Sequence, residues 1–377
     1  MPQLRKYALV PLVVILGLTF IEVVCSSTNI FLPEGWLVRH KMFYEFIQPD
    51  DVLLFKPRPN LRNLEMAWPD DAISGTYSTD NFGFRNMGRD YANSKIFIVG
   101  DSYVWGTYVS REEGLCGVVE AELEESVINL GVGGYDFLRY EILFDSFVAK
   151  YKPDVVVLGV FANDLVDRSK FKGGYPGAGE DYYKALGWDK YQHFPTYKKT
   201  LTYNLFNRGE AKSGGNGNQY NLKLYSERKV ASNGLTLYKY RGADKDYLKN
   251  PEAIQDVESH FSRIIKIAHE TNVILVAFLF PTKESTYKQE YQRLFPQSAG
   301  YLRNEEIGYE MLCRHAQSSG VVCVDLTEVF RQHGENELLY HYLDNHWNPA
   351  GNRLAATEVA KVIRNLRSRV RLNHLRR

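Results

Sequence analysis

The sequence is poor in features that would point to several common classes of protein. It has only 4 cysteines in 377 residues, with neither a metal-binding spacing nor a disulfide framework. Its 46 basic and 45 acidic residues give a formal net charge of +1, so no global charge favours a nucleic-acid partner. We therefore expect no metal site, no bound cofactor and no nucleic-acid partner.

Three of the four cysteines, Cys116, Cys313 and Cys323, follow the N-terminal segment, so one of them must stay unpaired within the chain. A Cys313–Cys323 bridge suits an oxidising compartment, and buried free thiols are at least as well supported by the residues alone. Both alternatives stay open.

Long apolar runs are also scarce, and the longest begins near the N-terminus. Residues 7–25 are almost entirely apolar, with Glu22 as the single charge. A helix that crosses a bilayer needs about 20 such residues. Arg5 and Lys6 precede the run, and no small-residue cleavage site follows it. The pattern predicts an uncleaved transmembrane anchor within residues 1–25, with the remainder of the chain outside the cytoplasm.

The rest of the chain alternates between short apolar runs and helix-like segments. The apolar runs lie at 95–99, 127–130, 154–160, 272–280 and 320–325. The helix-like segments lie at 111–125, 136–150, 252–270, 303–318 and 350–370. This alternation is typical of a parallel sheet covered by helices on both faces. We predict an α/β domain over residues 91–377 with five parallel strands.

Two stretches depart from this pattern. Residues 26–90 are expected to form an irregular lead-in segment that packs on the main domain. Residues 168–250 form a long insert, with a glycine-rich stretch at 212–219 and an aromatic cluster at 175–197. Loops of this length are usually lids or binding segments, and a carbohydrate platform and a small self-packed subdomain are equally compatible with this one.

Polar residues follow three of the predicted strands, and a further polar motif precedes the last helix. The motifs are Gly100-Asp101-Ser102, Gly131-Val132-Gly133-Gly134, Asn163-Asp164 and Asp344-Asn345-His346. Because parallel strands end at one edge of the sheet, we expect these groups to converge there. Gly-Asp-Ser alone is a weak signal, since about 0.1 copies are expected by chance in a chain this long.

The combined motifs hold the parts of an acyl-transfer site. Ser102 would be the nucleophile, His346 the base that takes its proton, and Asp344 the carboxylate that orients His346. The backbone N–H groups of Ser102 and Gly134 and the side-chain amide of Asn163 would donate to the developing oxyanion. The chemistry requires neither a metal nor a cofactor.

These blocks resemble the SGNH (GDSL-type) hydrolase superfamily, which is named for its Ser, Gly, Asn and His residues. The resemblance covers about residues 90–370 apart from the insert. It implies a three-layer α/β/α sandwich of the flavodoxin type, and it implies the same catalytic roles for Ser102, His346 and Asp344. It also implies Ser102, Gly134 and Asn163 as the oxyanion hole.

Two blocks depart from the usual pattern of this superfamily. Phe161 stands where the third block usually has glycine, and Asp344 lies two residues before His346 rather than three. Asp-x-His-Trp, together with Pro281-Thr282-Lys283, is similar to the alginate O-acetyltransferase (AlgX/AlgJ-like) branch, which modifies exported polysaccharides. In that branch the Asp-x-His motif precedes the serine, whereas here it follows Ser102.

The leading hypothesis is a membrane-anchored, extracytoplasmic serine esterase that acts on an acylated small molecule or glycan, with O-acetyl groups favoured. The alternative is a polysaccharide O-acetyltransferase that uses the same site and works with a membrane-bound acyl-donor partner. A non-catalytic glycan-binding protein on the same fold is the third hypothesis.

Overall fold

The computed structural model describes residues 15–25, 27, 41–68, 73–165, 225–240, 251–297 and 299–375. Of the predicted membrane anchor, residues 15–25 are helical, and residues 7–14 lie outside the described part. Among the helices in these ranges, none is long and apolar enough to cross a membrane. The anchor therefore stays a prediction.

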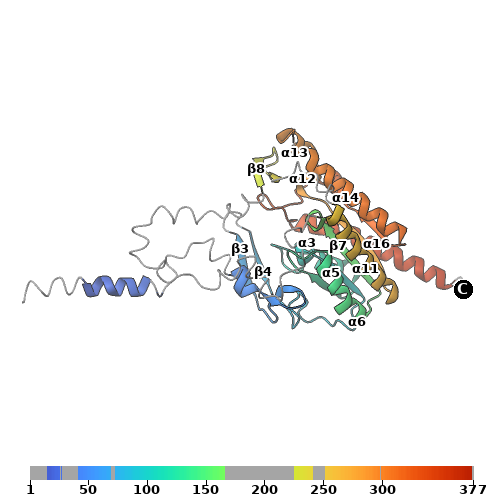
Figure 1. The fold of residues 1–377 in the computed structure, drawn as a ribbon, viewed down its shortest axis with the longest axis horizontal. Coiled ribbons are helices and arrows are strands. Elements are labelled where there is room, and N and C mark those ends of the chain that lie inside the picture. Colours follow the sequence, from blue (N-terminus) through green and yellow to red (C-terminus); the bar gives the residue numbers. More distant parts are fainter. Residues whose placement is uncertain are drawn as a thin grey trace, which may run out of the picture.

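A five-stranded parallel sheet forms the centre of the domain (Figure 1). Its strands lie in the order β11-β10-β7-β5-β6, and every pairing between neighbours is parallel. The strands are β5 (Ile96–Gly100), β6 (Val127–Gly131), β7 (Val155–Phe161), β10 (Ile274–Phe280) and β11 (Val322–Asp325). This is the flavodoxin-type order, in which the direction of strand addition changes between the neighbouring strands β5 and β7. Each of the five apolar runs in the sequence corresponds to one strand of this sheet, as predicted.

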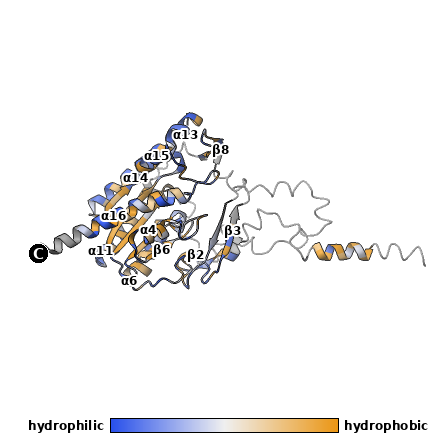
Figure 2. Cartoon of the chain, turned by 180° about the vertical axis from the view of Figure 1, so that it is seen from behind, coloured by the Kyte–Doolittle hydropathy of each residue, from blue (hydrophilic) through white to orange (hydrophobic). Residues whose placement is uncertain are grey.

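Helices cover both faces of the sheet. One face packs against α5 (Phe137–Leu143), α11 (Pro251–Glu270) and α14 (Ala299–Ser318), and the other packs against α4 (Leu115–Leu123), α15 (Thr327–Gly334) and α16 (Pro349–Leu375). Successive strand residues point to opposite faces, so Phe97 and Ile98 of β5 belong to different cores. Figure 2 shows the apolar character of the central strands. The predicted three-layer sandwich is confirmed.

Short elements complete the main domain around the ends of these strands. They are α3 (Ser102–Trp105), η3 (Phe144–Val148), α6 (Ala149–Tyr151), η4 (Ala162–Leu165), α12 (Lys283–Thr286) and α13 (Lys288–Leu294).

The lead-in segment is more regular than the sequence indicated. Its described part begins with η1 (Lys41–Phe46) and continues with two antiparallel hairpins. The hairpins pair β1 (Ile47–Asp50) with β2 (Leu54–Pro57), and β3 (Leu64–Trp68) with β4 (Ile73–Tyr77). Strands of only 4 or 5 residues contain too few alternations to be recognised from their hydrophobic pattern.

Arg85 of the lead-in makes several contacts with the main domain. Its buried guanidinium donates to the carbonyl oxygens of Trp105 at 3.0 Å, Gly106 at 2.7 Å and Val109 at 3.1 Å. Burial lowers the pKa of Arg85 to about 10, so the side chain is still charged at neutral pH. Arg85 thereby binds the lead-in to the segment that follows Ser102.

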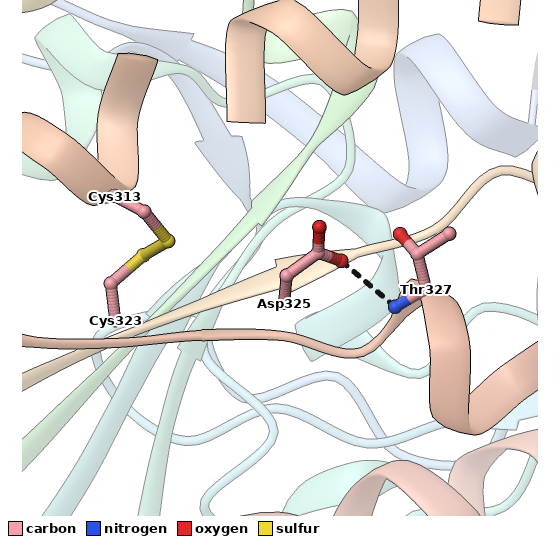
Figure 3. The surroundings of a disulfide bond; sticks show 4 residues. All are labelled: Cys313, Cys323, Asp325 and Thr327. Carbon is pink, nitrogen blue, oxygen red and sulfur yellow. Dashed lines mark hydrogen bonds between the residues drawn. A yellow bond between two sulfur atoms is a disulfide. The ribbon is translucent and has the colours of Figure 1, made fainter. Parts of the chain in front are cut away.

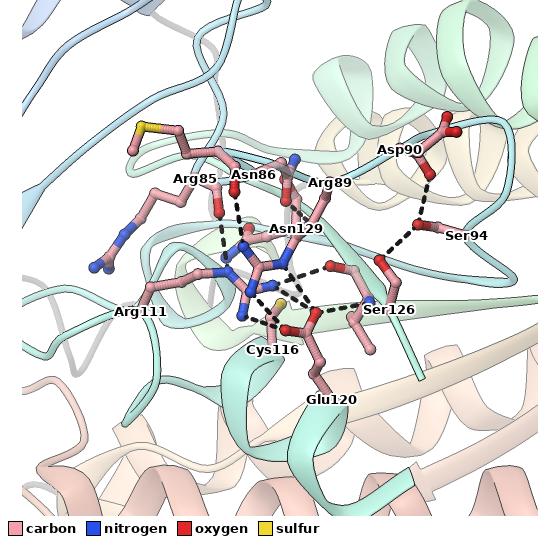
Figure 4. A network of polar contacts seen from close by, with 12 residues as sticks. Arg85, Asn86, Arg89, Asp90, Ser94, Arg111, Cys116, Glu120, Ser126 and Asn129 are labelled. Atoms are coloured by element: carbon pink, nitrogen blue, oxygen red, sulfur yellow. Dashed lines mark hydrogen bonds and ion pairs between the residues drawn. The ribbon is translucent and has the colours of Figure 1, made fainter. Parts of the chain in front are cut away.

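A second group of contacts extends this junction (Figure 4). Arg89 of the lead-in and Arg111 of the main domain both donate to the Glu120 carboxylate, at 2.9 Å and 3.1 Å. The side-chain oxygen of Asn86 accepts the backbone N–H of Asn129 in β6 at 2.8 Å. The lead-in is therefore joined to the segment after Ser102, to α4 and to β6.

Only a hairpin at 225–240 is described within the insert. It consists of β8 (Tyr225–Val230) and β9 (Thr236–Tyr240), which pair antiparallel. Its residues Ala231, Leu235 and Leu237 join the core on the α16 side of the sheet. The glycine-rich stretch at 212–219 and the aromatic cluster at 175–197 lie outside the described residues.

Cys313 of α14 and Cys323 of β11 form a disulfide bond (Figure 3). Cys116 is a buried free thiol, and burial raises its pKa to about 12. Of the two alternatives that the sequence left open, the structure therefore contains the disulfide.

Candidate active site

The segment around Ser102 turns from strand to helix within two residues. β5 ends at Gly100, and the Asp101 carboxylate caps α3 by accepting the backbone N–H of Tyr103 at 3.0 Å. A Cβ atom at Gly100 would lie 2.8 Å from the carbonyl oxygen of Gly159 on the adjacent strand, so only glycine fits there. The turn leaves Ser102 at the first position of α3, at the carboxyl edge of the sheet.

The structure brings Ser102, His346 and Asp344 into one hydrogen-bonded chain. His346 Nε2 lies 2.8 Å from Ser102 Oγ, although 244 residues separate the two in sequence. His346 Nδ1 lies 2.5 Å from Asp344 Oδ1, which also accepts the backbone N–H of His346 at 2.7 Å. In this arrangement Nδ1 carries the proton and Nε2 is free to take one from the serine hydroxyl.

The electrostatic environment suits a histidine that becomes charged. Burial alone would lower the pKa of His346, but the charge of Asp344 and its hydrogen bond, with the charge of Asp101, raise that pKa above its ordinary value. Burial would raise the pKa of Asp344, but the His346 charge, the hydrogen bonds from His346 and the Lys283 charge together hold it below its ordinary value. An imidazolium at position 346 is therefore stabilised by a carboxylate that stays ionised.

Asp101 is a second carboxylate beside Ser102. Its Oδ2 lies 3.3 Å from Ser102 Oγ, and burial raises its pKa. Besides capping α3, Asp101 therefore offers the Ser102 hydroxyl an acceptor other than His346.

The glycine segment after β6 lies next to Ser102. A Cβ atom added to Gly133 would be 3.7 Å from the Ser102 Cβ, and one added to Gly131 would be 2.4 Å from the backbone nitrogen of Trp105. Gly134 has a φ of 80°, in the left-handed region that glycine tolerates best. The predicted donor Gly134 thus follows directly after a glycine whose added Cβ would lie within van der Waals distance of Ser102.

Asn163 lies in η4, directly after β7, and its side chain is exposed. The buried Asp164 holds this turn, because its Oδ2 accepts the N–H of Phe161 at 3.0 Å and the hydroxyl of Tyr140 at 3.0 Å. Burial, with the charge of Asp101, raises the pKa of Asp164 well above its ordinary value. β7 neighbours β5 in the sheet, so Asn163 and Ser102 follow two adjacent strands.

Aromatic residues that the sequence did not single out surround His346. The ring of Tyr103 lies 5.2 Å from the His346 ring, between centroids, and that of Tyr108 lies 5.9 Å away. Tyr108 has a φ of 61°, which is uncommon for a bulky residue. Burial lowers the pKa of the nearby His341 to about 4, so this second histidine is neutral.

Tyr103 could have been suspected from its place next to Ser102 in the sequence. Tyr108 carries no sequence signal, because its left-handed backbone and its contact with His346 depend on the fold. Across the described ranges, no group of three or more His, Cys, Asp or Glu side chains is arranged to hold a metal ion.

The flavodoxin-type sandwich and the Ser-His-Asp chain at its carboxyl edge are features of the SGNH class of hydrolases. Residues 242–374 match the family model described as "SGNH hydrolase-like domain, acetyltransferase AlgX". The matched range includes Asp344, His346 and the Pro281-Thr282-Lys283 motif. The resemblance of the chain to the SGNH superfamily, with a C-terminal block of the AlgX type, is thereby confirmed.

Comparison with solved structures finds proteins of similar fold at low sequence identity. A protein assigned to the G-D-S-L lipolytic family from Desulfitobacterium hafniense is 13% identical, with a TM-score of 0.40, over 72% of this chain and 99% of that one. The acetyl xylan esterase AlAXEase is 16% identical, with a TM-score of 0.39, over 71% and 98%. A member of the same lipolytic family from Veillonella parvula is 13% identical, with a TM-score of 0.39, over 71% and 96%. No curated protein matches the sequence.

Proposed function

We propose that the protein is a serine esterase that cleaves acyl esters, with O-acetyl groups favoured, on small molecules or glycans. The observation that carries this proposal is the continuous chain from Ser102 Oγ to His346 Nε2, at 2.8 Å, and from His346 Nδ1 to Asp344 Oδ1, at 2.5 Å. The Ser102–His346 distance is within the hydrogen-bonding reach that proton transfer to a general base requires, and the contact with Asp344 orients the imidazole for it.

In the proposed reaction Ser102 Oγ attacks the ester carbonyl carbon while its proton passes to His346 Nε2. The carbonyl oxygen becomes an oxyanion, for which the N–H groups of Ser102 and Gly134 and the amide of Asn163 are the proposed donors. The C–O bond to the alcohol then breaks, and His346 returns the proton to the leaving oxygen. Water, deprotonated by His346, attacks the acyl-serine, releases the carboxylic acid and restores the Ser102 hydroxyl.

The second candidate function is transfer of the acyl group to a sugar hydroxyl, with that hydroxyl replacing water in the last step. The family model at residues 242–374 favours it, because its description names an acetyltransferase. A transferase would need an acyl donor on the same side of the membrane, supplied by a membrane-bound partner. Measuring whether acetate appears free or bound to an added glycan separates the two functions.

Replacement of the nucleophile tests both candidates. In Ser102→Ala the hydrolysis of p-nitrophenyl acetate should fall by about 10⁴- to 10⁶-fold, since no acyl-enzyme forms. Ser262→Ala is the matched control, because Ser262 is exposed on α11 and donates to a carbonyl of its own helix. If Ser102→Ala hydrolysed the ester as fast as the unchanged protein, both candidates would fail, because both require Ser102 as the nucleophile. If the unchanged protein itself hydrolysed no ester and transferred no acyl group, the non-catalytic glycan-binding hypothesis would replace both.

We also propose that residues 7–25 hold the enzyme in the membrane with the catalytic domain outside the cytoplasm. The length and apolarity of this run, together with Arg5 and Lys6 before it, support the proposal. Deletion of residues 1–25 should move the protein from the membrane fraction to the soluble fraction and leave Ser102-dependent hydrolysis in place. A full-length protein recovered entirely in the soluble fraction would contradict it.

A further inference from the structure

The loop at 341–346, here called the acid–base loop, carries Asp344 and His346 but contains no helix or strand. An isolated bridge between Tyr340 and Trp347 closes it. Such a loop has to obtain its backbone partners from elsewhere in the protein. Every one of its six carbonyl oxygens has a donor, and five of them have a donor that comes from another segment of the chain.

Lys283 supplies three of these contacts. It lies at the start of α12, just after β10, and its side chain is fully buried. Its ammonium group donates to the carbonyl oxygens of His341 at 2.8 Å, Tyr342 at 3.0 Å and Asp344 at 3.1 Å. Three rotatable donors on a compact charge match three converging carbonyls, whereas the planar fork of arginine would not.

The residue before Lys283 is fixed by hydrogen bonds of its own. The Glu305 carboxylate accepts the backbone N–H of Thr282 at 3.1 Å and its hydroxyl at 2.7 Å. The hydroxyl of Thr282 in turn caps α12 by accepting the N–H of Ser285 at 3.0 Å. Lys283 therefore extends from a rigid turn at the end of a central strand.

The β8–β9 hairpin of the insert supplies further donors to the carbonyl oxygens of the acid–base loop. The backbone N–H of Thr236 donates to the carbonyl of Tyr342 at 2.8 Å, and the hydroxyl of Tyr238 donates to the carbonyl of Leu343. The N–H of Tyr238 is fixed by the Glu284 carboxylate at 3.1 Å, next to Lys283. The hairpin and Lys283 thus hold consecutive carbonyls of the same loop.

We propose that Lys283 and the β8–β9 hairpin are positioning elements that set the distance and orientation of His346 relative to Ser102. Part of the insert would then serve catalysis through the acid–base loop rather than through contact with substrate. The inference rests on the proposed function. Misplacing a catalytic group by about 1 Å can cost about 10²-fold in rate, which sets the expected effect of releasing the loop.

The test compares Lys283→Met and Tyr238→Phe with two matched controls in the full-length protein. Lys288→Met removes a lysine of α13 that pairs with Glu306 at 2.8 Å on the surface. Tyr91→Phe removes a buried hydroxyl that donates to the Asp80 carboxylate at 2.6 Å, in a contact that involves neither the acid–base loop nor the turn before Lys283. The measurements are kcat and KM for p-nitrophenyl acetate, the thermal midpoint, and the far-downfield proton resonance of His346 Nδ1–H, which is identified by its loss in His346→Gln.

We expect kcat to fall about 100-fold in Lys283→Met and about 10-fold in Tyr238→Phe, with KM within about twofold of the unchanged enzyme. The His346 Nδ1–H resonance should shift or broaden in both variants and stay in place in both controls. In the Lys283→Met, Tyr238→Phe double variant, the fold-decrease in kcat should be smaller than the product of the two single fold-decreases, because both side chains hold the same loop.

If Lys283→Met and Tyr238→Phe lowered only the thermal midpoint, with kcat and the resonance unchanged, the two residues would be merely structural and the proposal would be overturned. Tyr238→Phe removes one hydroxyl and keeps the test available if Lys283→Met does not fold. If the unchanged protein showed no Ser102-dependent turnover but the resonance responded as expected, the positioning role would stand and the proposed function would fail.

Discussion

Replacing Asp344 by asparagine separates the orienting role of the carboxylate from its space-filling role. The Asp344 Oδ1 atom accepts two hydrogen bonds from His346, one from Nδ1 at 2.5 Å and one from the backbone N–H at 2.7 Å. An asparagine has nearly the same shape, but it is neutral, and its NH₂ group can donate to Nδ1. His346 would then carry its proton on Nε2, where it cannot accept the proton of Ser102.

The expected loss in kcat is about 10⁴-fold, the size associated with a histidine held in the wrong tautomer. This equals about 5.4 kcal/mol of transition-state stabilisation, since each factor of ten corresponds to about 1.36 kcal/mol. The charge of Asp101, which also raises the pKa of His346, remains in the variant and preserves part of the stabilisation of the imidazolium.

The pH dependence should change with a defined sign. The neutral form of His346 is the active base, so activity rises with pH through its pKa, which in the unchanged enzyme lies above the ordinary value of about 6.5. Loss of the Asp344 charge removes the main contribution that raises this pKa. In Asp344→Asn the rising limb should therefore move to lower pH while the plateau falls.

The assay is the pH profile of kcat/KM for p-nitrophenyl acetate, recorded for Asp344→Asn and for Asp325→Asn as the matched control. Asp325 also ends a strand of the sheet, and its carboxylate accepts the N–H of Thr327 at 2.8 Å (Figure 3). The control should keep both the plateau and the limb. A plateau in Asp344→Asn within tenfold of the unchanged enzyme, with the limb unmoved, would refute the proposed role of Asp344.

Two further changes have distinct expected outcomes. Asn163→Ala should lower kcat for p-nitrophenyl acetate by about 10²- to 10³-fold, because it removes one proposed oxyanion donor. The thermal midpoint should change little, because Asn163 is exposed. If the variant and the unchanged enzyme had equal kcat values, Asn163 would not be an oxyanion donor. Loss of the Cys313–Cys323 bridge, in a Cys313→Ser, Cys323→Ser double variant, should lower the free energy of unfolding by about 2 to 3 kcal/mol, since it closes a loop with a sequence separation of 10. Denaturant unfolding measures that change, and an unaltered midpoint would contradict it; kcat should stay as in the unchanged enzyme.

The residues alone predicted the architecture and the three groups of the hydrogen-bonded chain. Buried parallel strands such as β7 need apolar side chains on both faces, so they are visible as continuous apolar runs. The chemistry of Ser102, His346 and Asp344 was likewise recognisable, because each lies in a short motif next to a predicted element. Both kinds of signal are local, and a local signal can be read without knowledge of the fold.

The tertiary structure decided what depends on contacts between distant segments. The short hairpins of the lead-in became recognisable only from their pairing and from the bonds of Arg85 to the segment after Ser102. The disulfide required α14 and β11 to be neighbours. The contacts of Lys283 and Tyr238 with the acid–base loop span 58 and 105 residues, respectively. No local sequence pattern predicts such contacts, because every residue has a backbone carbonyl and its side chain does not indicate which distant donor will bind that carbonyl.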